Sequence, residues 1–209
     1  MNSDTSPRTD GARARPDRHP AATIALHWVS AIAVLLAFAV AWTRAGVDDR
    51  GTRLVLMNLH QLAGLLVLAL MLARVGTRIA TRASRYEAPL PPLMRWAAFG
   101  THLVLYALLL AMPLLGWALS NAHGHDVRLA GLPALPALVG ADPDRAETLE
   151  SWHVGLAWVL GAMVVAHVGA ALFHHFVRRD GVLRSMLPVA GQGAGRARPR
   201  LQLQDSRSF

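Results

Sequence analysis

The chain has 209 residues, of which 53% are hydrophobic and 16% are charged, whereas soluble domains are charged at about a quarter of their positions. It contains no cysteine, which excludes disulfide bonds, thioether-attached haem and cysteine-held iron–sulfur clusters. The formal net charge is +8, and all 21 basic residues are arginine. Beside long apolar runs, such charge indicates membrane topology and contact with anionic lipid rather than a nucleic-acid partner.

The two ends of the chain are polar. Residues 1–20 are rich in proline, glycine, serine and arginine, and they lack the apolar core and cleavage site of a signal peptide. Residues 188–209 are rich in glycine, arginine and glutamine. We expect both segments to be disordered tails, because neither can bury enough apolar surface to fold.

Four apolar runs lie between these tails, and each is near or above the ~20 residues that a helix needs to cross a bilayer. They occupy residues 21–42, 54–79, 94–120 and 151–177. Pro113 lies in the third run, where a membrane helix tolerates proline. The runs predict an all-α, integral membrane four-helix bundle, with one membrane domain at 21–187. The connection 121–150 holds the proline-rich stretch LAGLPALPALVG, which we expect to pack over the bundle as a short cap, and the sequence does not identify what it binds.

The arginines indicate how this bundle is oriented. Sixteen lie in the N-terminal tail, the connection after the second run and the C-terminal segment, whereas five lie in the first and third connections. The side of a membrane protein with the arginine excess faces the cytoplasm. We therefore expect the N-terminus and the C-terminus to be cytoplasmic. The opposite side combines its five arginines with seven carboxylates, which gives it a net charge of −2.

Several histidines fall within the runs, whereas no aspartate or glutamate does. Ionisable residues inside a membrane are costly and by default functional. The histidines in or beside the runs are His27, His60, His102, His153, His167, His174 and His175. The lack of acidic partners disfavours a zinc site and a transporter with carboxylates at mid-membrane.

Four of these histidines form two pairs at two depths. His153 and His167 share the fourth run, 14 residues apart, which places them within about 40° of one helix face and about 21 Å apart along the axis. His60 begins the second run at the outer depth of His153, and His27 lies near the inner depth of His167. Two bis-imidazole sites suit two haem b groups, whose iron takes two axial imidazoles without a thioether link.

Other residues near these depths have simpler alternatives. Arg74 and Arg78 lie near the inner end of the second run, where they either hold haem propionates or extend to the lipid headgroups. A hydrogen-bonding role is an even alternative for His174 and His175, and it is the favoured interpretation of His102 at the inner interface. The paired depths of the other four histidines argue against a merely structural role for that set.

Four segments together resemble the prokaryotic cytochrome b561 family of small four-span dihaem proteins. They are ALHWVSAIAVL at 25–35, NLHQLAGLLVLALMLARVGTR at 58–78, THLVLYALLLAMPLLGW at 101–117 and the fourth run with HVGAALFHHFVRRDGVLRSMLP at 167–188. The resemblance covers most of residues 21–188. It implies a multi-pass protein of the bacterial inner membrane, with His27 and His167 on a cytoplasmic haem and His60 and His153 on a periplasmic haem.

The resemblance also implies a function, which is single-electron transfer between a periplasmic donor and membrane quinone, with ubiquinone as the expected substrate. It places quinone near the cytoplasmic haem, where His174 and His175 are candidate contacts. One type of family member oxidises superoxide, so a quinone-linked oxidoreductase of that kind is one expectation. However, the outer net charge of −2 would not steer an anion inward. The alternative is a haem-bearing membrane anchor that conducts electrons for a separate dehydrogenase, hydrogenase or small cytochrome.

Overall fold

The computed structural model describes residues 20–80, 91–128 and 133–187, and these residues form four long helices. The helices are α1 (Ala21–Ala45), α2 (Arg50–Ala80), α3 (Pro92–Ala122) and α4 (Pro143–Phe173). α4 continues into a π-helical turn, η1 (His174–Arg178), and a short helix, α5 (Val182–Met186), follows. The expected all-α fold is confirmed. The predicted tails, apart from Pro20, lie outside the described residues.

The helix ends follow local capping chemistry. The backbone N–H of Thr52 donates to Asp49 Oδ2 over 2.7 Å at the start of α2, and the hydrogen bonds from Thr52 lower the pKa of Asp49. At α4, Asp142 Oδ1 accepts from the N–H of Arg145, and Pro143 occupies the first helical position, as expected at a helix N-terminus. α4 therefore begins eight residues before the predicted run at 151. Its first two turns are polar, so they lie outside the apolar run from which the helix was predicted.

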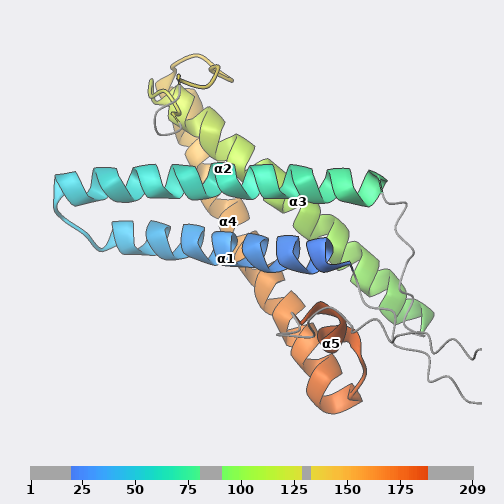
Figure 1. Cartoon of the computed structure of the whole chain (residues 1–209). Coiled ribbons are helices and arrows are strands. Elements are labelled where there is room, and N and C mark those ends of the chain that lie inside the picture. Colours follow the sequence, from blue (N-terminus) through green and yellow to red (C-terminus); the bar gives the residue numbers. More distant parts are fainter. Residues whose placement is uncertain (1–19, 81–90, 129–132, 188–209) are drawn as a thin grey trace, which may run out of the picture.

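The helices pack as two crossed pairs. α1 and α2 run antiparallel side by side, α3 packs against α4, and this second pair crosses the first obliquely, with α2 also contacting α3 (Figure 1). Two small clusters of buried side chains fill the interior. They comprise Ala33, Val34, Val67 and Met71 in one cluster, and Leu105, Leu108, Met112 and Leu160 in the other. Phe38 packs against both clusters and so joins the two pairs.

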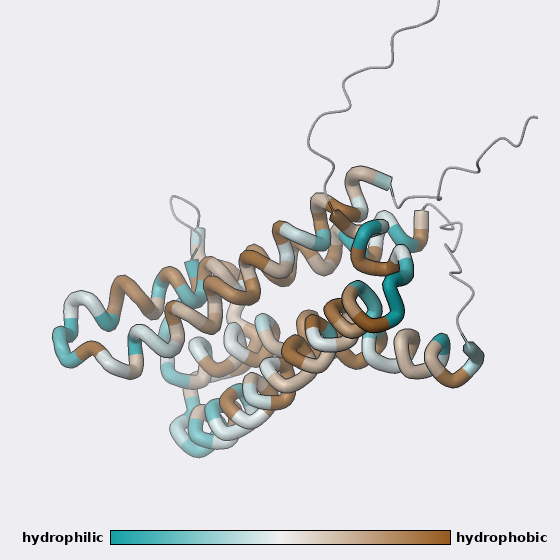
Figure 2. Tube along the Cα trace, turned by 90° about the horizontal axis from the view of Figure 1, so that it is seen from below, coloured by the Kyte–Doolittle hydropathy of each residue, from teal (hydrophilic) through white to brown (hydrophobic). Residues whose placement is uncertain are grey.

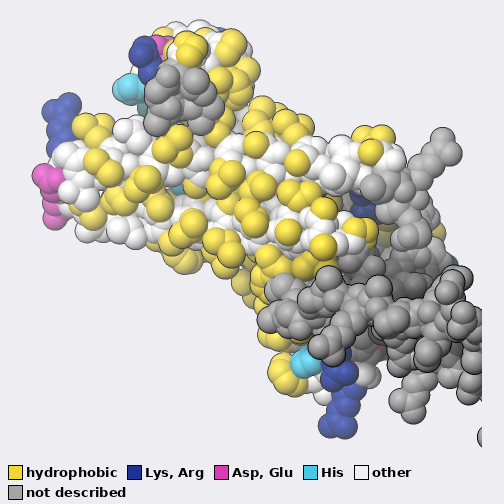
Figure 3. All heavy atoms as spheres, viewed as in Figure 1, with side chains coloured by type: hydrophobic (Ala, Val, Ile, Leu, Met, Phe, Trp, Pro, Cys, Tyr) yellow, Lys and Arg dark blue, Asp and Glu magenta, His cyan; other side chains and the backbone are white. Residues whose placement is uncertain are grey.

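The outer faces of the helices are apolar. Trp158 and Val165 on α4 are 66% and 73% exposed, and hydrophobic side chains cover much of the visible surface (Figure 3). Hydrophobic residues occupy much of the helix lengths, and hydrophilic residues gather near several of their ends (Figure 2). All four long helices are long and apolar enough to span a membrane. An apolar surface of this extent is suited to contact with lipid rather than water.

The connection between α3 and α4 folds back onto the end of the bundle. Asn121 holds it in place, donating from Nδ2 to the carbonyl of His125 and accepting the N–H of Leu138 at Oδ1. Ser120 accepts a hydrogen bond from Gln61 on α2, over 3.1 Å. Both Ser120 and Asn121 are buried, so these polar contacts satisfy groups that would otherwise be costly. The end of α3, to which the connection is bonded, is thereby joined to α2 through Gln61, one residue from His60.

Candidate functional site

The first histidine pair joins α2 to α4. The ring centroids of His60 and His153 lie 6.2 Å apart, with an interplanar angle of 80°. His60 Nδ1 is 3.0 Å from the carbonyl oxygen of Ala37 on α1. Because a carbonyl oxygen only accepts, Nδ1 carries the hydrogen and donates it, which leaves Nε2 with a free lone pair. The His60 ring is therefore oriented and held in the tautomer that a metal-binding imidazole needs.

The second pair joins α1 to α4. The ring centroids of His27 and His167 lie 6.3 Å apart, with an interplanar angle of 64°. Arg74 on α2 reaches this pair, since its NH1 lies 3.5 Å from His27 Nδ1 and its guanidinium carbon lies 5.4 Å from the centre of the Tyr106 ring. Arg78 is exposed one turn further along α2. The structure thus brings Arg74, but not Arg78, to the second pair.

Both centroid separations match the spacing of two imidazoles on one metal ion. With metal–nitrogen bonds of about 2 Å and ring centres ~1.1 Å behind the nitrogens, opposed imidazoles have centroids roughly 6.2 Å apart. Within the described ranges, no three His, Cys, Asp or Glu side chains come together as a metal site. Each pair could therefore supply two ligands to a metal ion, with the remaining positions left to a cofactor or to solvent. An iron tetrapyrrole fits this requirement, because its macrocycle supplies four nitrogens.

Buried polar atoms near the first pair lack protein partners. Among the described residues, the buried side-chain nitrogens without a hydrogen bond are Arg44 Nε, Trp117 Nε1 and His153 Nδ1. Arg44 follows Ala37 by seven residues on α1, which is two turns on nearly the same helix face. Trp117 follows Gly116, where an added Cβ would stand 3.1 Å from His153 Cε1. Arginine and tryptophan only donate, and a buried donor without an acceptor costs about 1–3 kcal/mol. Their environment suits a cofactor that carries carboxylates.

His102 is a member of the second site that sequence reasoning did not select. Its ring centroid lies 5.4 Å from that of His167, and its Nδ1 donates to the carbonyl of Ala98 over 2.6 Å. The preferred interpretation, a hydrogen-bonded histidine, accounts for this Nδ1 contact. That interpretation does not predict that the packing of α3 places the His102 ring beside the second pair. Matching His102 to His167 by depth, as was done for the other helices, could have found this neighbour.

The two remaining candidates, His174 and His175, have separate environments in η1. His174 Nδ1 lies 2.5 Å from Asp180 Oδ2, whereas His175 stacks edge-on against Phe176 at 4.8 Å. Partial burial raises the pKa of Asp180, but hydrogen bonds from His174 and the Val182 backbone, with the charges of His174 and Arg178, outweigh burial and lower it. Asp180 is thus held as a carboxylate beside one histidine of the two.

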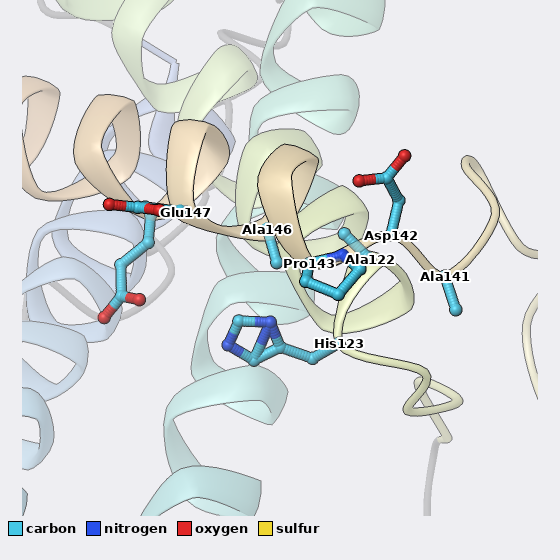
Figure 4. A pocket seen from close by; sticks show the side chains of 8 residues that line it. Ala122, His123, Ala141, Asp142, Pro143, Ala146 and Glu147 are labelled. Carbon is cyan, nitrogen blue, oxygen red and sulfur yellow. The ribbon is translucent and has the colours of Figure 1, made fainter.

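A pocket of about 460 Å³ lies where α3 ends and α4 begins, and no sequence prediction fell on it. Asp142, Glu147 and Glu150 contribute carboxylates to its lining, and His123 lies opposite (Figure 4). Asp142 already accepts the N–H of Arg145, and the side chains of Asp142 and Glu147 point in different directions (Figure 4). The pocket therefore presents negative charge without converging ligands.

Comparison with known proteins finds matches over most of the chain. The model of the prokaryotic cytochrome b561 family matches residues 18–189. Cytochrome b561 homolog 2 of Escherichia coli (strain K12) is 35% identical over 187 residues, which cover 86% of this chain and 96% of that protein. Cytochrome b561 homolog 1 of the same organism is 33% identical over 172 residues, covering 79% and 94%. A probable superoxide oxidase, CybB, of Yersinia pestis is 31% identical over 173 residues, covering 79% and 93%.

Proposed function

Because the chain belongs to the prokaryotic cytochrome b561 family, we propose that it is a dihaem cytochrome that passes single electrons between a periplasmic donor and membrane quinone. Family membership and the four spanning helices make it a multi-pass protein of the bacterial inner membrane that uses haem b in electron transfer. The proposal adds the number of haems, their ligands, the orientation of the bundle and the quinone.

The two histidine pairs carry the proposal. His60 and His153 are assigned to an outer haem and His27 and His167 to an inner haem, since both centroid separations, 6.2 Å and 6.3 Å, suit an iron between them. When bound, each haem supplies a reversible one-electron couple. The protein supplies the axial nitrogens and an apolar surrounding. α4 contributes one ligand to each site, so a single helix joins the two.

Positively charged or donating side chains are assigned to the haem carboxylates. Arg44 Nε and Trp117 Nε1, buried without protein acceptors, are suited to the outer haem. Arg74 is suited to the inner haem, since an iron on Nε2 of His27 leaves Nδ1 protonated and unable to accept from arginine. Arg74 would then turn from the 3.5 Å contact with His27 towards a carboxylate. Arg78 is a second candidate for the same carboxylates.

The arginine distribution orients the bundle with both termini in the cytoplasm, so the inner haem and η1 lie on the cytoplasmic side. His174 follows His167 by seven residues, on nearly the same helix face. We assign quinone to this end, with His174 as its principal polar contact and His175 as a second candidate. A protein that reduces quinone in this way acts as a quinone-linked oxidoreductase.

One observation favours the alternative of an electron conduit for a separate protein. The outer connections carry a net charge of −2, and three of their seven carboxylates, those of Asp142, Glu147 and Glu150, line the pocket at the start of α4. Negative surface attracts a basic partner and repels superoxide. A periplasmic donor protein with a basic docking face is therefore the competing source of electrons, although a relative is named a probable superoxide oxidase.

Haem counting tests the ligand assignment directly. We expect the wild-type protein to contain two b-type haems per chain, and His153→Ala and His167→Ala each to retain one. His123→Ala, which changes a histidine at the pocket, should retain both. The measurement is a reduced-minus-oxidised spectrum with pyridine haemochrome quantification. Two haems retained in either ligand variant would contradict the assignment.

The electron source is tested on the quinone-loaded protein by stopped-flow mixing with superoxide. Rapid quinol formation would identify superoxide as a donor, and the conduit alternative predicts none. In the second case, quinone reduction should require a co-purified partner. The haem count does not depend on this result.

A further inference from the structure

The π-helical turn at the end of α4 places a carboxylate against a histidine ring. Asp180 Oδ2 lies 2.5 Å from His174 Nδ1, and their side chains are 28% and 17% exposed. Asp180 Oδ1 accepts the backbone N–H of Val182 over 3.2 Å, and Arg178 Nε lies 3.7 Å from Oδ2. The first contact joins an imidazole nitrogen to a carboxylate, and a hydrogen bond to a charged group is stronger than one between neutral groups. The Val182 N–H thus holds one oxygen of the Asp180 carboxylate while the other oxygen orients the His174 ring.

The local backbone is arranged to make this contact. Arg179 adopts a left-handed conformation with φ 53° and ψ 33°, and the N–H of Asp180 then returns to the carbonyl of His174 over 3.2 Å. A residue other than glycine rarely adopts a left-handed conformation, because its Cβ then crowds the following carbonyl oxygen, and π-helical turns frequently occur at functional sites. This unfavourable backbone conformation occurs directly before Asp180, which contacts His174.

The turn is also tied to the helix that carries His27. Trp28 Nε1 on α1 donates to the carbonyl of Met186 at the end of α5 over 2.7 Å, and the rings of His27 and Trp28 are 5.6 Å apart. α5 accordingly folds back beside the end of α4 (Figure 1). The His174–Asp180 pair is therefore positioned relative to the inner histidine pair and does not belong to a free terminus.

We propose that Asp180 is a positioning residue that holds His174 as the proton donor to the reduced quinone. This inference rests on the proposed function, in which quinone binds at this end. Reduction of a quinone to a quinol takes two electrons from the donor and two protons, one for each oxygen. With Nδ1–H donated to Asp180, His174 presents Nε2. Its Nε2–H bond breaks as an O–H bond forms on one quinone oxygen, cytoplasmic water supplies the proton of the other oxygen, and water then restores the proton of His174.

The charged groups around the ring support this role. Among the described residues, Asp180 and Arg178 are the charged side chains joined to the pair, and α5 contributes the Val182 backbone and α1 the neutral Trp28 contact. A carboxylate in contact with Nδ1 accepts its hydrogen and so leaves Nε2 as the ring nitrogen that can face the quinone. Arg178 Nε lies farther from Asp180 Oδ2 than His174 Nδ1 does. Its positive charge therefore offsets the negative charge of Asp180 without replacing the hydrogen bond to His174.

Asp180 also caps α5 through Val182, so a purely structural role must be separated from proton transfer. Asp180→Asn retains an oxygen for the cap, because asparagine caps helices as well as aspartate does, but it removes the negative charge. Asp180→Glu restores the charge. Asp49→Asn is a matched control, because Asp49 caps α2 in the same way and lies at the opposite end of the bundle.

The experiment uses purified full-length protein, reduced with dithionite and freed of excess reductant, then mixed anaerobically with a soluble ubiquinone analogue at several pH values. We expect Asp180→Asn to keep both haem spectra, with a melting temperature lowered no further than that of Asp180→Ala. Its haem reoxidation should slow by about tenfold or more, with the pH profile moved to lower pH. Asp180→Glu should recover most of the rate, and Asp49→Asn should match the wild type.

A second variant protects the interpretation. In a His174→Gln background, Asp180→Asn should cause no additional loss of rate, because the aspartate acts through the histidine. An Asp180→Asn protein with the wild-type rate and pH profile would overturn the inference while the quinone function stands. Wild-type protein that the quinone does not reoxidise would overturn the quinone function, and this inference with it.

Discussion

His60 on α2 donates its Nδ1 hydrogen to the carbonyl oxygen of Ala37 on α1, across 3.0 Å. The outer histidine pair therefore depends on three helices, since α4 supplies His153, α2 supplies His60, and α1 sets the orientation and tautomer of His60. A backbone carbonyl is a fixed acceptor that no side-chain substitution removes. The geometry of this pair is consequently most sensitive to changes in the side chains that surround the two rings.

Gly116 on α3 limits where the His153 ring can lie. A Cβ at this position would stand 3.1 Å from His153 Cε1, so the ring would have to shift by a few tenths of an ångström. We expect Gly116→Ala to alter the spectrum and midpoint potential of the outer haem and leave the inner haem unchanged. Redox titration followed by optical spectroscopy measures both. Gly64→Ala is the control, because a Cβ there meets no atom within 4 Å.

Arg44 tests the assignment of the outer haem carboxylates. Removing a half-buried positive charge close to a haem disfavours the reduced form, so Arg44→Gln should lower the outer midpoint potential. The expected shift is about 30–60 mV, since 59 mV corresponds to about 1.4 kcal/mol for one electron. Arg53→Gln, at an exposed position near the start of α2, should leave both potentials unchanged. Equal shifts in the two variants would indicate a general surface-charge effect and contradict a specific contact.

His102 distinguishes a neighbour of the inner haem from a ligand. Its Nδ1 already donates to Ala98, and its ring lies 5.4 Å from that of His167. We expect His102→Phe to retain two haems per chain but to shift the inner midpoint potential, because a polar ring beside an axial ligand is replaced by an apolar one. Haem quantification with redox titration measures both quantities. Loss of one haem would instead make His102 an iron ligand and displace His27 or His167 from that role.

The lowered pKa of Asp180 gives a pH dependence with a defined sign. Because its pKa in the folded protein lies below the ordinary value of 3.8, its contribution to stability is present above pH 3.8 and is lost as the pH falls through the folded pKa. Wild-type protein should therefore melt at a higher temperature than Asp180→Ala at neutral pH, and the two should converge under acid conditions. Thermal unfolding monitored by circular dichroism between pH 3 and pH 8 measures this. A difference that persists unchanged in acid would exclude the carboxylate charge as its source.

The parts of the fold that depend on one helix at a time were predictable. Four apolar runs identify α1 to α4, and the 14-position separation of His153 and His167 places two rings on one face because helical geometry is regular. The start of α4 was placed eight residues late. Its first turns are amphipathic and polar, and only the Asp142–Pro143 capping signal marks their beginning.

Contacts that depend on how separate segments pack together are harder to predict from the sequence. The approach of His102 to His167 is set by the packing of α3 on α4, for which the sequence gives only an approximate depth. The contact of Asp180 with His174 requires a π-helical turn and a left-handed Arg179, and neither follows from residue preferences. The unpartnered Nε of Arg44 and Nε1 of Trp117 can be recognised only after every protein acceptor has been placed.

α4 carries a histidine of each pair, and this has a consequence for the ways in which the family can diverge. One residue inserted between His153 and His167 would rotate one ring by about 100° relative to the other and advance it by about 1.5 Å. A substitution in the same interval leaves both rings in place. Length variation among relatives should therefore be confined to the connections and tails. The interval between the two histidines should change in composition, while the histidines stay 14 positions apart.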